Sequence, residues 1–192
     1  MGSEMCIRDS IDTAGLRRKN KIKEELEHFM ILRTVSAVER ADIVVLVIDA
    51  VEGVTEQDAK IAGIAHDRGK ATIIAVNKWD AIEKTEKTVR EYESRIREVL
   101  SFMPYAKITF ISAKSGQRLV KLYDLIDTVA ENHAMRVATG VLNEIMAEAV
   151  AMQQPPSDKG RRLKLFYITQ VSVKPPTFVI FVNDKNLSLI HI

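Results

Sequence analysis

Three apolar runs, separated by helix-like segments, constrain the fold of this chain more than any other feature of its 192 residues. The runs are Ile43–Ile48, Ala71–Val76 and Lys107–Ala113. Nearly consecutive apolar positions are typical of strands that are buried on both faces in a parallel sheet. Parallel strands need a crossover between them, and the crossover is usually a helix. The order therefore predicts an α/β fold, a parallel sheet with helices on both faces.

Four segments around these runs have apolar residues at helical spacing. They are residues 31–41, 55–66, 83–100 and 119–132. Gly69 is expected to end the second segment in a left-handed conformation. One face of the third segment is expected to point inward. This face consists of Val89, Tyr92, Ile96, Val99 and Leu100.

The pattern changes after Met135. One more amphipathic helix is expected at 141–152, followed by two β-rich runs at 163–173 and 177–183 with no crossover helix between them. A helix followed by an antiparallel hairpin indicates a separate α+β module, with its linker within 132–138. Alternation along the hairpin favours a core face rather than a base-stacking surface for four aromatic residues, Phe166, Tyr167, Phe178 and Phe181.

Both ends of the chain look foreign to the protein. Met5–Ser10 can be encoded by a DNA string whose reverse complement encodes Leu187–Ile192, which resembles a translated sequencing adapter. We therefore interpret residues 1–10 and 187–192 as adapter-like, non-native segments and expect the rest to be a fragment. The single cysteine, Cys6, is excluded with them, so disulfide frameworks and cysteine metal sites are not expected.

Composition excludes several classes of protein. No run reaches the roughly eighteen apolar residues of a membrane span, and no signal peptide begins the chain, so we expect a cytoplasmic protein without a membrane partner. The formal net charge of +2 favours no nucleic acid partner by itself, and no DNA partner is expected.

Polar residues follow the second apolar run where the strand is expected to end. They are Asn77, Lys78 and Asp80. Ligands of open parallel sheets bind beyond the carboxyl ends of the strands. An ionised carboxylate only accepts hydrogen bonds, so Asp80 beside a planar ring selects an edge with two adjacent donors, which guanine has and adenine lacks. The alternative is an ordinary polar loop, since these residue types are common in loops.

Two further motifs favour the nucleotide interpretation. Asp12-Thr13-Ala14-Gly15 precedes the first strand, and Ser112-Ala113-Lys114 follows the third. With "NKWD", these resemble the third, fourth and fifth motifs of P-loop GTPases in order and strand context. The resemblance implies that GTP or GDP is bound.

The resemblance also implies roles for individual residues. Asp12 would serve the Mg²⁺ site, and the Gly15 backbone N–H would approach the γ-phosphate, so both count as catalytic candidates. Backbone N–H groups around Ser112 and Ala113 would bind the guanine carbonyl. Leu16 stands where many small GTPases have a water-orienting Gln, so another group or a monovalent cation such as K⁺ would assist hydrolysis.

Longer segments resemble the Der (EngA) family of ribosome-assembly GTPases. They are "DTAGLRRKNKI", "RTVSAVERADIVVLVIDAVEGVTEQD", "FISAKSGQ", "KGRRLKLFYITQ" and "KPPTFVIFVND". The resemblance covers Ile11 to Asn186 and implies part of a second G domain at 11–134 and part of a KH-like domain at 135–186. It also implies GTP hydrolysis and a role in assembly of the large ribosomal subunit, with ribosomal RNA as partner. Era- or MnmE-like GTPases are the nearest alternative.

No phosphate-binding loop of the form G-x-x-x-x-G-K-[ST] occurs in the chain; Gly69-Lys70-Ala71 lacks the first Gly and the hydroxyl. We expect this loop and the first switch to lie upstream, and the chain alone to be inactive. The competing hypothesis is a non-enzymatic module that binds RNA or protein.

Two basic runs are candidates for contact with RNA phosphates. They are Arg17, Arg18, Lys19, Lys21 and Lys23, and then Arg161, Arg162 and Lys164. No GXXG loop follows Met135, so sequence-specific RNA reading is not expected.

Overall fold

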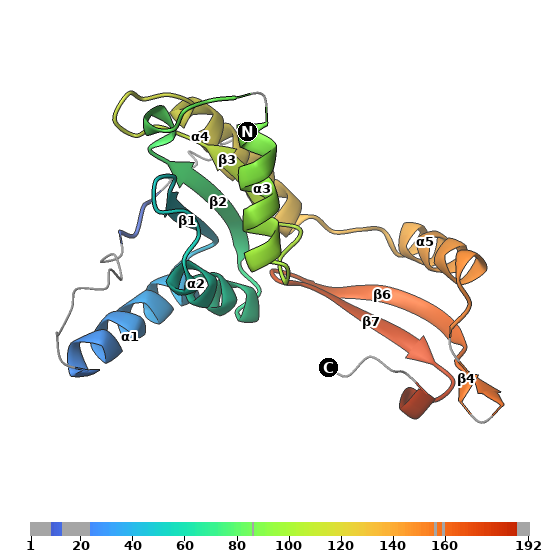
Figure 1. Ribbon diagram of the computed structural model, residues 1–192. Coiled ribbons are helices and arrows are strands. Elements are labelled where there is room, and N and C mark those ends of the chain that lie inside the picture. The colour runs from blue at the N-terminus through green and yellow to red at the C-terminus, as the bar shows by residue number, and fades with distance from the viewer. Residues whose placement is uncertain (1–8, 13–23, 86, 156, 159, 188–192) are drawn as a thin grey trace, which may run out of the picture. The chain divides into compact units, whose positions relative to one another are not determined.

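The structure is a computed structural model that describes residues 9–12, 24–85, 87–155, 157–158 and 160–187 (Figure 1). The chain divides into two compact units, Met1–Ala130 and Glu131–Ile192.

The first unit contains a parallel sheet in the order β1-β2-β3 (Figure 1). Its strands are β1 (Ile43–Asp49), β2 (Ala71–Asn77) and β3 (Lys107–Phe110). The central strand β2 is buried at six consecutive positions, as the apolar run predicts. The predicted α/β fold class is confirmed. β1 differs from the prediction of burial on both faces, because Val47 is 55% exposed. No strand among the described residues pairs with the other edge of β1.

Helices connect and cover these strands (Figure 1). They are α1 (Glu24–Arg40), α2 (Glu56–Asp67), α3 (Thr88–Val99) and α4 (Leu119–Ala134). The side chain of Thr55 caps α2 by accepting from the Asp58 N–H, and the Asp58 carboxylate accepts from the Thr55 N–H in return. Gly69 has φ of 61°, which confirms the predicted left-handed residue after this helix.

The core lies between the sheet and helices α2 and α3. Ala62 of α2 and Ile96 of α3 pack in one cluster with alternate residues of the strands, among them Leu46, Ile74 and Val76. The prediction for α3 was partly wrong. The helix begins at Thr88 rather than at Glu83, and the hydroxyl of Thr88 accepts the Thr85 N–H of the loop before it.

The inward face of α3 also differs from the prediction. Val89 and Val99 are exposed, whereas Thr88, Ile96 and Leu100 are buried. Residues 88, 92, 96 and 100 form one row at a spacing of four, and Val89 and Val99 lie beside that row rather than in it.

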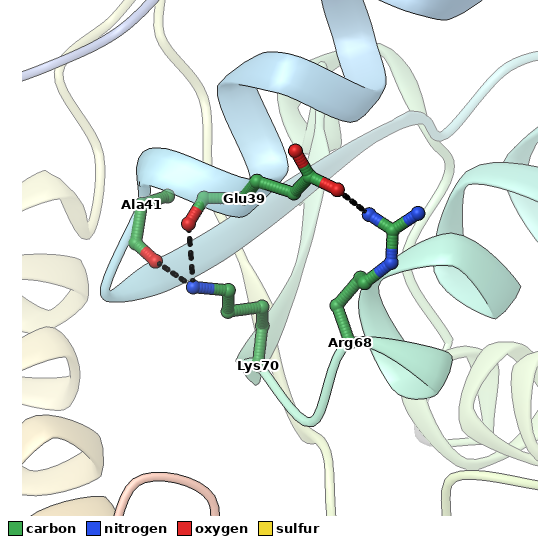
Figure 2. A network of polar contacts seen from close by, with 4 residues as sticks. All are labelled: Glu39, Ala41, Arg68 and Lys70. Atoms are coloured by element: carbon green, nitrogen blue, oxygen red, sulfur yellow. Dashed lines mark hydrogen bonds and ion pairs between the residues drawn. The ribbon is translucent and has the colours of Figure 1, made fainter.

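A polar network joins the end of α1 to the segment between α2 and β2 (Figure 2). The Lys70 ammonium donates to the carbonyl oxygens of Glu39 and Ala41, at 2.8 and 2.9 Å. Arg68 pairs with the Glu39 carboxylate on the exposed side. Because the last carbonyls of a helix lack intrahelical donors, Lys70 acts as a C-terminal cap for α1.

The second unit contains α5 (Thr139–Met152) and an antiparallel hairpin of β6 (Leu165–Val173) and β7 (Pro176–Val182). Short strands β4 (Ser157–Asp158) and β5 (Arg161–Arg162) pair before it, and the turn η2 (Lys185–Leu187) follows it. The amide of Asn143 bonds both the N–H and the carbonyl of Ile168, which fixes α5 against β6.

The aromatic residues of the hairpin are exposed. Phe166 is 62% exposed, and the other three predicted core residues, Tyr167, Phe178 and Phe181, are also open to solvent. The interpretation of these four residues as a core face is therefore wrong for this structure. α5 packs against β6 and leaves these four rings uncovered.

Within the described residues, no helix has the length and apolar content needed to cross a bilayer.

Candidate functional site

Residues from two loops meet at the carboxyl ends of β2 and β3, where parallel sheets bind ligands. Asn77 is the last residue of β2, and the turn η1 (Trp79–Ala81) follows it. Lys78 lies between them with φ of 61°, a left-handed conformation that is uncommon for a residue with a side chain. This local geometry turns the chain sharply at the tip of β2.

Trp79 anchors the turn to the core. Its side chain is only 2% exposed, and its ring lies 5.1 Å from that of Tyr92 and 4.3 Å from that of Phe110. The Trp79 N–H donates to the carbonyl of Ile111 at 3.1 Å. An aromatic residue packed on two other rings fixes the positions of its sequence neighbours Lys78 and Asp80.

Asn77 links the β2 tip to the loop after β3. Its Oδ1 accepts a hydrogen bond of 2.9 Å from the Ala113 N–H. The neighbouring Ser112 N–H donates to the carbonyl of Gln117. Both backbone groups that the sequence suggested for a base carbonyl thus have acceptors within the chain.

Ser112 positions the carboxylate of Asp80. Its side chain is fully buried, and its hydroxyl donates to Asp80 Oδ1 at 2.6 Å, while the Ser115 N–H donates to the same hydroxyl at 3.2 Å. The Ser112 hydroxyl is the main cause of a lowered pKa at Asp80, to which the nearby Lys114 and Lys84 ammonium groups also contribute. Asp80 is therefore an ionised acceptor at neutral pH.

Lys78 forms an ion pair that the sequence did not indicate. Its ammonium lies 2.5 Å from Oδ2 of Asp49, the last residue of β1, and the other oxygen of Asp49 accepts the Val51 N–H at 2.9 Å. The pKa of Asp49 is lowered mainly by the hydrogen bond from Lys78. The sequence places Asp49 directly after the first apolar run, but only the register of β1 with β2 brings it level with Asn77.

These loops surround a pocket of about 310 Å³ lined by Asn77, Lys78, Asp80, Ala81 and Lys114. Its lining residues bring together an amide, a carboxylate and two lysines. Four of the residues singled out from the sequence therefore meet in one place, and Ser112 and Ala113 support them through hydrogen bonds to Asp80 and Asn77.

Of the predicted phosphate-side residues, the structure describes Asp12, which is exposed and is not among the residues that line the pocket. Thr13, Ala14, Gly15 and Leu16 lie outside the described residues, as does the basic run from Arg17 to Lys23. In the part of the chain that is described, no group of three His, Cys, Asp or Glu side chains could hold a metal ion.

Comparison with known proteins identifies relatives of both units. Residues 27–132 match the family model of the elongation factor Tu GTP binding domain, and residues 136–189 match that of the KH-domain-like C-terminal part of EngA bacterial GTPase enzymes. The chain is 76% identical over 177 residues to GTPase Der of Agathobacter rectalis and 75% identical to GTPase Der of Lachnoclostridium phytofermentans. Each alignment covers 92% of this chain and 40% of the relative, so the chain spans well under half of their length.

A solved structure shares the fold. The crystal structure of a probable GTP-binding protein engB matches with a TM-score of 0.51 and 23% identity, over 62% of this chain and 76% of the other.

Proposed function

Since this chain belongs to the Der family of GTP-binding proteins, we propose that the pocket at the tips of β2 and β3 binds the guanine base of GTP and GDP. The observation that carries the proposal is the Asp80 carboxylate, which lines the pocket and is held by the buried Ser112 hydroxyl. A carboxylate held in this way matches the ring N–H and exocyclic amine of guanine. The KH-like match at 136–189 disfavours the Era- and MnmE-like alternatives.

Asn77, Lys78, Ala113 and Lys114 complete the proposed base site. The lysine stems would lie along the faces of the base, since both residues line the pocket. The Ala113 N–H donates to Asn77 Oδ1. The guanine carbonyl would replace Asn77 as the acceptor of this N–H or share it with Asn77. Asn77, which lines the pocket, would thus hold the Ala113 backbone in place before the base binds.

The phosphate side rests on the family resemblance. Asp12, Thr13, Ala14 and Gly15 would contact the phosphates, with Asp12 serving Mg²⁺. An exposed carboxylate fits a magnesium ion held largely by phosphate oxygens and water. The ion would neutralise charge on the transferred phosphoryl group. Leu16 stands where many small GTPases have a water-orienting Gln. That a monovalent cation assists hydrolysis instead remains a prediction.

A role in ribosome assembly, with large-subunit ribosomal RNA as partner and a cytoplasmic location, is part of the same proposal. Arg161, Arg162 and Lys164 are exposed at the start of the hairpin, while Leu163 between them is buried. Three exposed cations around one buried residue suit contact with RNA phosphates, and such binding would weaken as salt is raised.

The proposed base recognition can be tested with three diphosphates. In a protein of the relatives' full length that carries this segment, GDP should bind most tightly. IDP, which lacks the exocyclic amine, should bind about tenfold or more weakly, because Asp80 loses one donor, and ADP should bind weakest. Calorimetric titration measures the order, and ADP binding as tight as GDP would contradict the proposal.

The 192-residue chain alone should show no micromolar binding of a fluorescent GDP, because its sequence contains no G-x-x-x-x-G-K-[ST] loop. Micromolar binding by the chain would contradict this expectation and show that the base pocket alone suffices to bind GDP.

A further inference from the structure

The ion pair between Lys78 and Asp49 lies at the edge of the proposed base pocket, and no motif of the sequence accounts for Asp49. Lys78 is one of the residues that line the pocket, and its ammonium is paired with the Asp49 carboxylate. The Lys78 side chain is 53% exposed and the Asp49 side chain 14%. The lysine is therefore the more exposed member of the pair, and the aspartate the more buried one.

Two features fix Asp49. It ends β1 opposite Asn77, the residue before Lys78, so the register of the sheet places the two loops side by side. Its Oδ1 accepts the Val51 N–H at 2.9 Å, which leaves Oδ2 for the ammonium at 2.5 Å. Tyr92 holds the same loop from α3, since its hydroxyl donates to the carbonyl of Ala50 at 2.7 Å.

The lysine needs such an anchor. A four-carbon side chain loses considerable rotamer freedom when it is ordered. Lys78 stands on a turn with φ of 61°, and its ammonium is bound at the far end by a carboxylate of the neighbouring strand. With both ends held, the alkyl stem between them is ordered where a base would contact it.

We infer that Asp49 is a positioning residue for guanine nucleotide binding, which orders the Lys78 stem as one wall of the base pocket by holding its ammonium. Asp49 does not line the pocket and acts through Lys78. The inference rests on the proposed function of the pocket and assigns to it a residue from a strand outside the nucleotide motifs.

A double-mutant cycle tests the inference in the full-length protein that carries this segment. Asp49→Asn keeps an oxygen for the Val51 N–H and removes the charge, and Lys78→Met keeps the stem and removes the ammonium. Asp49→Asn should weaken GDP binding about two- to fivefold, as for a partly exposed ion pair. In the Lys78→Met background, Asp49→Asn should cause no further loss of GDP affinity.

Glu52→Gln is the matched control, because it removes an exposed charge from the same loop. This variant should bind GDP with unchanged affinity.

The pair itself can be tested without nucleotide. By carbon NMR titration of this chain, Lys78→Met should raise the pKa of Asp49 toward its ordinary value, whereas Glu52→Gln should not. An unchanged Asp49 pKa, or equal losses of GDP affinity from Asp49→Asn with and without the Lys78 ammonium, would overturn the inference. If the unaltered full-length protein binds no GDP, the proposed function fails, and the titration still decides whether the pair exists.

Discussion

A single buried hydroxyl governs both the position and the charge of the carboxylate in the proposed site. Ser112 donates to Asp80 and accepts from the Ser115 N–H, so its own orientation is fixed by backbone. Sequence motifs suggested the backbone of Ser112 as the functional group, but its side chain makes the contact with Asp80. The distinction has a measurable consequence, because the hydroxyl can be removed without moving the backbone.

Ser112→Ala should raise the pKa of Asp80 toward its ordinary value of 3.8, because the Ser112 hydrogen bond is the largest cause of the lowering. A lowered folded-state pKa means that the ionised carboxylate stabilises the fold above the unfolded value, and that this contribution is lost as pH falls through the folded value. The variant should therefore lose this contribution at higher pH than the parent. NMR titration of the carboxyl measures the shift.

Ser115→Ala is the matched control for that substitution. The contact from Ser115 comes from its backbone N–H, so removal of its hydroxyl should leave the pKa of Asp80 unchanged. Equal shifts in the two variants would mean that the loop, rather than the Ser112 hydroxyl, sets the charge of Asp80.

At the scale of the elements, Lys70 contributes more to holding the end of α1 than the ion pair beside it does. Lys70 is partly buried at its Ala41 contact and donates to two backbone carbonyls, while Arg68 and Glu39 are exposed partners (Figure 2). Charged donors to orphan carbonyls contribute more than exposed ion pairs do, because water competes less for them.

Lys70→Met should lower the free energy of unfolding by about 1–2 kcal/mol and increase hydrogen exchange in the last turn of α1. Arg68→Met, which breaks only the exposed pair, should lower it by less than about 1 kcal/mol. Urea denaturation and amide exchange measure both effects. A larger loss from Arg68→Met than from Lys70→Met would contradict this ranking.

At the scale of the whole molecule, sequence patterns predicted what depends on local periodicity and missed what depends on distant neighbours. The strands and the residues at the tip of β2 were predictable because apolar runs and turn residues act within a few positions. The role of Asp49 was not, since only the register of β1 with β2 brings it to Lys78. The exposure of Phe166 was missed because alternation along a strand shows that a face exists, but not what covers it.

The most direct test of the account is the nucleotide preference of Asp80→Asn in a protein of the relatives' full length that carries this segment. An amide presents a donor where the carboxylate accepts, so the variant should match xanthine, which has a carbonyl in place of the guanine amine. Calorimetric titration should show GDP affinity at this site reduced about 10- to 100-fold and XDP binding gained. An unchanged preference for GDP over XDP would contradict the assignment of Asp80 as the residue that recognises guanine.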